Sequence, residues 1–270
     1  MNEIDTKLYD FVAKDNYITQ VPFIFGMDIY EYDLKQANIH ALYCAGCLSE
    51  KEFAYLSMIP KQMREIEIGN RIRENRSLQD IIKENICYAK YEFVKANNID
   101  PFRIIRIAND SLYIVTSIVP QYTIIPKDNY HMEFVCKNHF TTFMKLNKPM
   151  LLFFDSSKDF WNIDVKGINK NKLPLHEPLL TAICNIIDAR VNGGKDIAIV
   201  QFNNLYRDYI GLDLPIEYYR EFNADSMFRL RNTQIENFLL NDSSMLSPKD
   251  LRIEYNQNLL RKIYSYLLES

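Results

Sequence analysis

The sequence is poor in glycine and cysteine for its length and has no long apolar run. Only 7 of its 270 residues are glycine, which favours a compact, helix-rich chain. Its 5 cysteines are an odd number scattered along the chain, a pattern typical of reduced, intracellular proteins. No apolar run reaches the ~20 residues of a membrane helix, and the N-terminal segment is too polar for a signal peptide. We therefore expect a cytoplasmic protein without a membrane partner.

Two kinds of catalytic signature are also missing. Neither GxGxxG nor GxxxxGK[ST] occurs, so the chain lacks the common glycine-rich phosphate loops. His40, His131 and His176 have no neighbouring serine or cysteine that would indicate a hydrolytic triad. The net charge of −3 excludes a uniformly basic nucleic-acid-binding coat, but it is compatible with a local basic groove.

The segments that are present alternate between strand and helix patterns. Residues 6–15 predict a short helix, 23–33 a strand, and 35–48 a helix with one apolar face. Ser49, with Glu52 three residues later, predicts the cap of a second helix. Residues 61–97 continue with a helical period and many charges.

The most distinct local pattern is a hairpin at residues 102–118. Two β-prone runs flank Asn109-Asp110, a pair that tolerates the positive φ angles of a tight turn. Further strand patterns occupy 121–125, 132–136, 150–154 and 161–165, and helices are expected at 176–192, before Gly193-Gly194, and from Ser247 onward. This order of elements predicts an α+β fold.

Two carboxylates hold notable positions in this arrangement. Asp33 ends the first long strand and Asp110 lies at the hairpin tip, so both project from one sheet edge if the strands are neighbours. Paired carboxylates there can hold two Mg²⁺ (or Mn²⁺) ions, which activate a hydroxyl and neutralise a leaving pyrophosphate. Ordinary turn chemistry also places aspartate after a strand and in a turn, and this alternative stays open.

The residues around both aspartates resemble motifs of family B DNA polymerases. Asp33-Leu34-Lys35-Gln36-Ala37-Asn38 is similar to the first catalytic motif of that family, although family A has a nearly equal similarity there. Asn109-Asp110-Ser111 resembles the second half of its Asp-Thr-Asp-Ser hairpin, and Asn85-Ile86-Cys87-Tyr88-Ala89 resembles its fingers motif. Lys145, Lys148 and Lys166 lie in segments similar to its later lysine motif and thumb-leading strand.

The resemblance implies a minimal palm enzyme without an exonuclease domain, from a phage or mobile element. Its expected parts are palm (1–40), a helical fingers-like insertion (41–97), palm again (98–172) and a helical thumb-like region (173–270). It would extend a primer on a template with nucleoside triphosphates, using Asp33, Asp110 and the Leu34 backbone as metal ligands. A viral enzyme of this kind would work in the host cytoplasm, with a separately encoded replication subunit as a candidate partner.

Other residues are candidates for nucleotide and nucleic-acid contacts. Asn38 takes the place of the family's sugar-packing tyrosine, while Asn85 and Tyr88 belong to the fingers motif. Basic side chains at helical spacing are candidates for the triphosphate, and later lysines for primer–template phosphates. The first set is Lys61, Arg64 and Arg71, and the second is Lys145, Lys148 and Lys166. A solvated helix face and a soluble surface are the respective alternatives.

Three rival interpretations stay open. Cys44, Cys47, Cys136 and His139 have zinc-ligand spacing, although thiols within a predicted helix are more often core residues. An RNA-synthesising or primase-like palm would use the same carboxylates. A catalytically silent palm remnant that binds or assembles with a partner would fit the altered motifs, for example Ala108 where the family has an aspartate.

Overall fold

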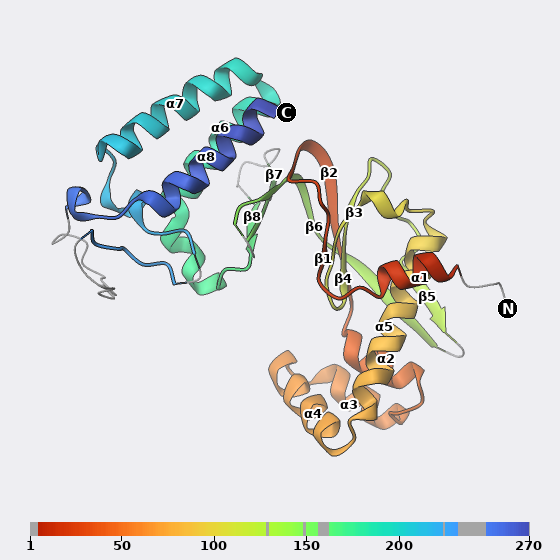
Figure 1. Cartoon of the computed structure of the whole chain (residues 1–270). Helices are drawn as coiled ribbons and strands as arrows, with labels where there is room; N and C mark the ends of the chain where they lie inside the picture. Colours follow the sequence, from red (N-terminus) through yellow and green to blue (C-terminus); the bar gives the residue numbers. More distant parts are fainter. Residues whose placement is uncertain are drawn as a thin grey trace. The chain divides into compact units, whose positions relative to one another are not determined.

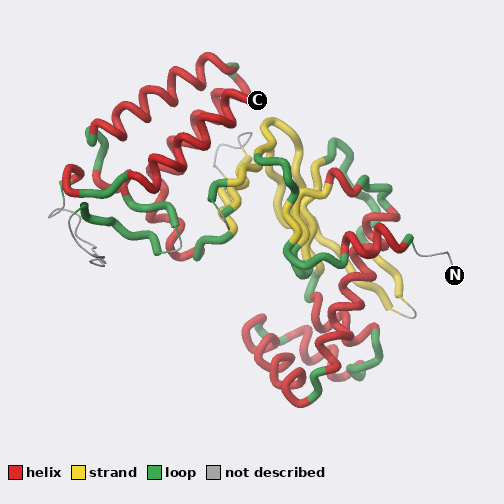
Figure 2. Tube along the Cα trace, in the orientation of Figure 1, coloured by secondary structure: helices red, strands yellow, loops and turns green. Residues whose placement is uncertain are grey.

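The computed structural model describes residues 5–127, 130–147, 150–155, 162–223, 225–231 and 247–269. These residues form eight α-helices and eight β-strands, and the assigned strand pairs are antiparallel, which confirms the α+β class (Figures 1 and 2). Within the described ranges, none of the helices combines the length and the apolar composition that crossing a membrane would take.

The chain divides into two compact units. The first contains Met1–Val21 and Asp28–His139, and the second contains Pro22–Met27 and Phe140–Ser270. Strands β2 (Phe23–Leu34) and β6 (Tyr130–Lys145) therefore have residues in both units. The expected functional boundaries after residues 40, 97 and 172 stay predictions.

The first unit is built on strands in the order β1-β3-β4-β2-β6. The two-residue strand β1 (Tyr17–Ile18) pairs with β3 (Ile104–Ile107), and β5 (Ile124–Lys127) pairs with β6. Strands β3 and β4 (Ser111–Val115) form the expected hairpin. Every residue of β4 is buried, so this strand lies in the interior of the unit.

Five helices accompany these strands, and in Figure 1 α2 to α5 gather at the end where β2 leads into α2. They are α1 (Thr6–Val12), α2 (Ala37–Cys44), α3 (Glu50–Met58), α4 (Lys61–Glu74) and α5 (Ser77–Ala96). Ser49 caps α3 in a capping box with Glu52, as its sequence predicts. The helical stretch 61–97 is interrupted at Asn75, whose backbone is extended and whose side chain accepts hydrogen bonds from Ser77.

The second unit combines the C-terminal part of β6 with β7 (Leu151–Asp155) and β8 (Asn162–Lys166). Its helices are α6 (Glu177–Asn192), α7 (Lys195–Gly211) and α8 (Glu254–Glu269), and α7 packs against both of the others. Gly193 ends α6 as expected, and Gly194 has the positive φ of 96° that only glycine adopts without strain. Short 3-10 helices span Pro101–Arg103 in the first unit and Lys170–His176, Ile216–Tyr219 and Pro248–Asp250 in the second.

The terminal helix begins later than the sequence predicts. Ser247 caps the 3-10 helix Pro248–Asp250 through the amide of Lys249, and α8 starts only at Glu254. Between them, Leu251 is fully buried and forms an isolated β-bridge with Leu230. Burial of this leucine by a distant segment outweighs the local helical preference.

Candidate active site

The end of β2 and the tip of the β3–β4 hairpin meet at one place in the first unit. Asp33 is the register partner of Ser111, the residue that follows Asp110. The backbone amide of Leu34 donates a 2.9 Å hydrogen bond to the carbonyl oxygen of Asp110. The hairpin turn itself is closed by the Ala108 amide, which donates to the carbonyl of Ser111 at 2.9 Å. Two aspartates 77 positions apart in the chain are thereby held close together, one near the end of β2 and the other in the turn before its neighbour β4.

Asp33 and Asp110 line a common pocket of about 170 Å³. Four other candidates from the sequence line the same pocket: Leu34, Asn38, Lys61 and Arg64. The remaining lining residues are Gln36, Ala37, Ile39, Glu65 and Ile68. Segments from β2, α2, α4 and the hairpin thus contribute to one concave site.

A tight turn directs this part of the chain. Gln36 adopts a left-handed conformation with φ of 48°, so the chain reverses between the end of β2 and the start of α2. Helix α2 buries Ile39 and Leu42 in the core of the first unit, and Asn38 stays exposed at the pocket wall. The apolar face of the helix therefore determines that Asn38 faces outward.

The two carboxylates influence each other electrostatically. Burial, and then the nearby negative charge of Asp33, raise the pKa of the Asp110 carboxyl above its ordinary value. The positive charges of Lys137 and Lys61 act in the opposite direction. Like-charge repulsion between Asp33 and Asp110 would be relieved by a divalent cation, so this donor pair fits a hard metal ion.

Lys137 of β6 is a member of this site that the sequence did not indicate. Its amine contacts the Asp33 carboxylate at 3.3 Å. Burial alone would lower the pKa of Lys137, but Asp33, Glu31 and Asp110 together raise it above the ordinary lysine value. This lysine supplies positive charge to the carboxylate group from a strand that is distant in the sequence.

Glu31, on β2, joins Asp33 and Asp110 as a third acid that acts on Lys137, and the sequence analysis did not identify it. It is 2% exposed and accepts hydrogen bonds from the hydroxyl of Tyr113 and the amide nitrogen of Asn138. Glu31 and Asp33 lie two residues apart on one strand and so project from the same face, which is the signal that could have found it. Its hydrogen bonds connect β2 to β4 and β6.

The basic residues of α4 divide into two groups. Lys61 and Arg64 line the pocket, and Lys61 is largely exposed with Glu65 at 3.6 Å. Arg71 does not line the pocket, because its guanidinium is paired with Glu52 at 2.9 Å and Glu67 at 3.5 Å. Hydrogen bonds from Ser49 and then from Arg71 lower the pKa of Glu52 to about 2.

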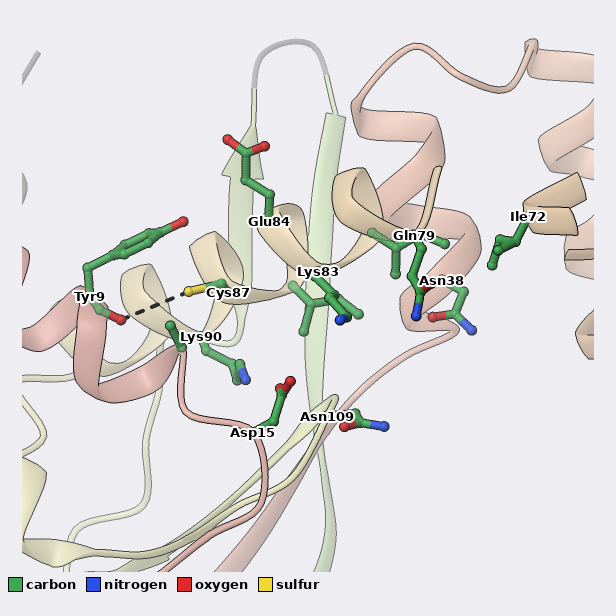
Figure 3. A pocket seen from close by; sticks show the side chains of 13 residues that line it. Tyr9, Asp15, Asn38, Ile72, Gln79, Lys83, Glu84, Cys87, Lys90 and Asn109 are labelled. Carbon is green, nitrogen blue, oxygen red and sulfur yellow. Dashed lines mark hydrogen bonds between the residues drawn. The ribbon is translucent and has the colours of Figure 1, made fainter. Parts of the chain in front are cut away.

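The fingers-motif candidates Asn85 and Tyr88 lie on α5, and their nucleotide-binding role stays a prediction. Asn85 is buried and donates to the Ile81 carbonyl at 2.8 Å, while Tyr88 lies under the Lys127 amine at 4.6 Å. Neither residue lines the pocket at Asp33 and Asp110 or the neighbouring cavity shown in Figure 3. That cavity is lined instead by α5 residues that include Gln79, Lys83 and Lys90.

The candidates for primer–template contacts lie in the second unit. The backbone amide of Lys145 donates to the Pro22 carbonyl at 2.8 Å, and Lys166 is paired with Asp164 at 2.5 Å. Lys148 lies outside the described residues. Contact of these three lysines with nucleic acid stays a prediction.

The family model described as "Bacteriophage PBS1 gene 130 protein" matches residues 4–268, which is nearly the whole chain. The chain belongs to this family. The comparison with curated proteins finds no match. Membership supports the phage origin that the sequence suggested.

The cysteines and the histidine with zinc-ligand spacing are not gathered at one place in the described part of the chain. Cys44 is buried in α2 and Cys136 is exposed on β6, while His139 contacts Asp28 at 2.8 Å. Across the described residues of this phage-family protein, no three His, Cys, Asp or Glu side chains are grouped to hold a metal ion. Any metal at Asp33 and Asp110 would therefore need ligands from backbone, water or substrate, which suits magnesium better than zinc.

Proposed function

We propose that this phage protein is a nucleotidyltransferase that extends a nucleic-acid primer with nucleoside triphosphates, most simply in template-directed DNA synthesis. The observation that carries the proposal is the shared pocket. Asp33 and Asp110 line it together with Lys61 and Arg64, although these residues come from three separate segments. Acidic and basic groups around one cavity are what a metal–triphosphate substrate requires.

In this proposal the chain supplies charge and alignment. Asp33 and Asp110, with the Leu34 carbonyl, would hold two Mg²⁺ or Mn²⁺ ions, which stabilise the developing negative charge of phosphoryl transfer when bound. Lys61 and Arg64 would bind triphosphate oxygens at the pocket wall. Asn38 would lie next to the sugar. Such positioning accounts for most of the rate enhancement in phosphoryl transfer.

The proposal also covers the nucleic-acid substrate and the cellular location. Lys145, Lys148 and Lys166 would contact primer–template phosphates, which gives affinity that depends on salt and not on sequence. A palm-like core with fingers-like α2–α5 and thumb-like α6–α8 would match the order of elements along the chain. The protein would act in the host cytoplasm, with a separately encoded replication subunit as a further candidate partner.

Primer extension tests the proposal directly. The purified protein would be incubated with Mg²⁺ or Mn²⁺, all four dNTPs or rNTPs, and primed DNA or RNA templates. Asp33→Asn and Asp110→Asn should each lower extension by roughly 10³-fold or more, because a metal ligand is worth several kcal/mol in the transition state. Asp80→Asn, at an exposed position in the first turn of α5, is the matched control. Absence of extension under every condition, or activity retained in both site variants, would refute the proposal.

Two observations favour a second candidate, a catalytically silent palm remnant that acts as a binding subunit. The Lys137 amine already neutralises Asp33, and Ala108 replaces an acid in the hairpin motif. Under this alternative, Asp33→Ala and Asp110→Ala would both leave phage replication intact in a complementation assay. Loss of replication with either variant, while the protein still folds, would exclude it.

A further inference from the structure

A polar cavity of the first unit lies beside the carboxylate pocket and is not used by the proposed reaction. Its volume is about 450 Å³, within the range of small-molecule sites. The end of α1 and the segment after it form one wall through Tyr9, Ala13 and Asp15, and α5 forms another (Figure 3). Asn38 lines both this cavity and the pocket at Asp33 and Asp110.

A buried lysine faces this cavity. Lys90 is 2% exposed, yet no hydrogen bond or ion pair joins its amine to another residue in the described part of the chain. Burial lowers the pKa of Lys90, although Cys87, Asp15 and Asp110 act in the opposite direction. A buried ammonium without a paired anion costs folding free energy, so its presence at a cavity wall favours an anionic ligand.

The other polar groups of the cavity extend this interpretation. Gln79, Lys83 and Lys90 follow one face of α5 at helical spacing. In Figure 3 the side chains of Lys83 and Lys90 extend toward the side of the cavity that holds Asp15 and Asn109. Two amines there can bind phosphate oxygens, and the carboxamides of Asn38, Gln79 and Asn109 can bind hydrogen-bonding groups of a heterocycle or sugar.

The apolar part of the cavity lining indicates that the ligand also has an apolar surface. Ile72, Ile82 and Ile86 contribute to the wall, so a purely ionic ligand would leave apolar surface uncovered. A phosphorylated molecule with a flat heterocyclic body satisfies both kinds of wall. We propose that this cavity binds a mononucleotide-sized phosphorylated ligand, with Lys90 and Lys83 on the phosphate, independently of any metal at Asp33 and Asp110.

Metal-free binding measurements test the inference. Isothermal titration with the four ribonucleoside 5′-monophosphates and with inorganic phosphate, all in EDTA, should show at least one nucleotide binding well above phosphate. Lys90→Met and Lys83→Met should each weaken that binding at least about tenfold, the usual worth of a charge-assisted contact to phosphate. Lys95→Met is the matched control, because Lys95 is exposed on the same helix, at 5.3 Å from the Tyr91 ring and outside the cavity.

Asp15→Asn should change the nucleotide affinity in the opposite direction to the two lysine variants. Asp15 lines the cavity, so removal of its negative charge should tighten nucleotide binding by a few fold, which loss of structure could not do. Lys90→Met also removes a buried charge and should keep the thermal unfolding midpoint at or above that of the wild type. Binding equal to wild type in Lys90→Met, no nucleotide binding at all, or phosphate binding as tight as nucleotide would each overturn the inference.

The same titrations separate this inference from the proposed polymerase activity. Asp33→Asn and Asp110→Asn should not weaken metal-free nucleotide binding, because neither residue lines this cavity and loss of a nearby negative charge favours an anionic ligand. Loss of binding in those variants would instead place the nucleotide at the carboxylate pocket and overturn the assignment to Lys90. Absence of primer extension together with intact, Lys90-dependent binding would refute the polymerase proposal alone.

Discussion

The amide of Leu34 and the carbonyl oxygen of Asp110 share a 2.9 Å hydrogen bond, which joins the last residue of β2 to the turn before β4. Because this bond is between backbone groups, substitution of the Asp33 or Asp110 side chain should leave it in place. Variants of Asp33 and Asp110 should therefore change the charge of the pocket with little change in its shape. The predictions for the carboxylates depend on this feature.

Asp110→Asn should raise the free energy of unfolding at pH 7 although it removes a proposed catalytic group. The pKa of Asp110 is raised in the folded protein, so the folded state binds its proton more tightly than the unfolded state does. Stability contributed by this group is therefore lost as pH rises through the carboxyl range. Urea unfolding should give a higher free energy of unfolding for Asp110→Asn than for wild type at pH 7, and no difference between the two at pH 3. A stability loss at pH 7 would contradict the repulsion between the aspartates.

Lys137→Met should tighten Mn²⁺ binding by about three- to tenfold, since the lysine amine competes with a metal ion for Asp33. Electron paramagnetic resonance of free Mn²⁺ measures this affinity. Lys35→Met is a close control, because Lys35 is similarly exposed and pairs with Glu133 at 3.1 Å instead of with an aspartate of the pocket. Weaker Mn²⁺ binding in Lys137→Met would show that the lysine supports the site in another way.

Arg64→Ala and Arg71→Ala should have separate effects. Arg64 lines the carboxylate pocket, so its loss should raise the KM for nucleoside triphosphate by roughly tenfold. Arg71 is engaged with Glu52 and Glu67, so its loss should lower the stability of the α3–α4 pair by up to about 1 kcal/mol and leave KM unchanged. Steady-state kinetics and urea unfolding of both variants check the pair. A larger KM effect from Arg71→Ala would reverse the assignment.

Asn38→Tyr should increase discrimination against ribonucleotides. The exposed side chain at this position lines the pocket beside Asp33, and a larger ring there would meet a 2′-hydroxyl. The ratio of kcat/KM for dNTP over rNTP should rise by about tenfold or more relative to wild type. A strong dNTP preference in the wild-type protein would contradict the idea that Asn38 leaves the sugar site open.

His176 should make the second unit sensitive to acid. It is 1% exposed, and its ring nitrogen Nε2 lies 2.9 Å from the Ser226 hydroxyl. Burial, and then the charge of Arg220, lower its pKa from 6.5 to about 4. The unfolded state therefore binds this proton more readily, and stability is lost as pH falls from about 6.5 to 4, by roughly 3 kcal/mol.

Urea unfolding of wild type, His176→Asn and the exposed-site control His131→Asn between pH 7 and pH 4 measures this dependence. The slope with pH should flatten in His176→Asn alone. If that variant does not fold, an NMR titration of His176 in the wild type gives the pKa directly. A pKa near 6.5 would contradict the prediction.

The sequence by itself determined the elements whose signals are local. Ser49 and Glu52 are three residues apart, and both halves of their capping box form within one helical turn. The β3–β4 hairpin likewise follows from the two β-prone runs around Asn109-Asp110, although neither residue of this turn adopts a positive φ. Because Asp33 lies next to the last residue of β2 and Asp110 lies in that turn, the elements that carry the carboxylates were also predictable, and the actual pairing of β2 with β4 brought them together.

Only the tertiary structure decided which charged groups meet. The pairing of Arg71 with Glu52, the approach of Lys137 to Asp33 and the cavity in front of Lys90 all join segments distant in the sequence. The late start of α8 has the same origin, because Leu251 is buried against another segment. Local propensity differs by tenths of a kcal/mol per residue, whereas burial of one side chain is worth a few, so packing determines these choices.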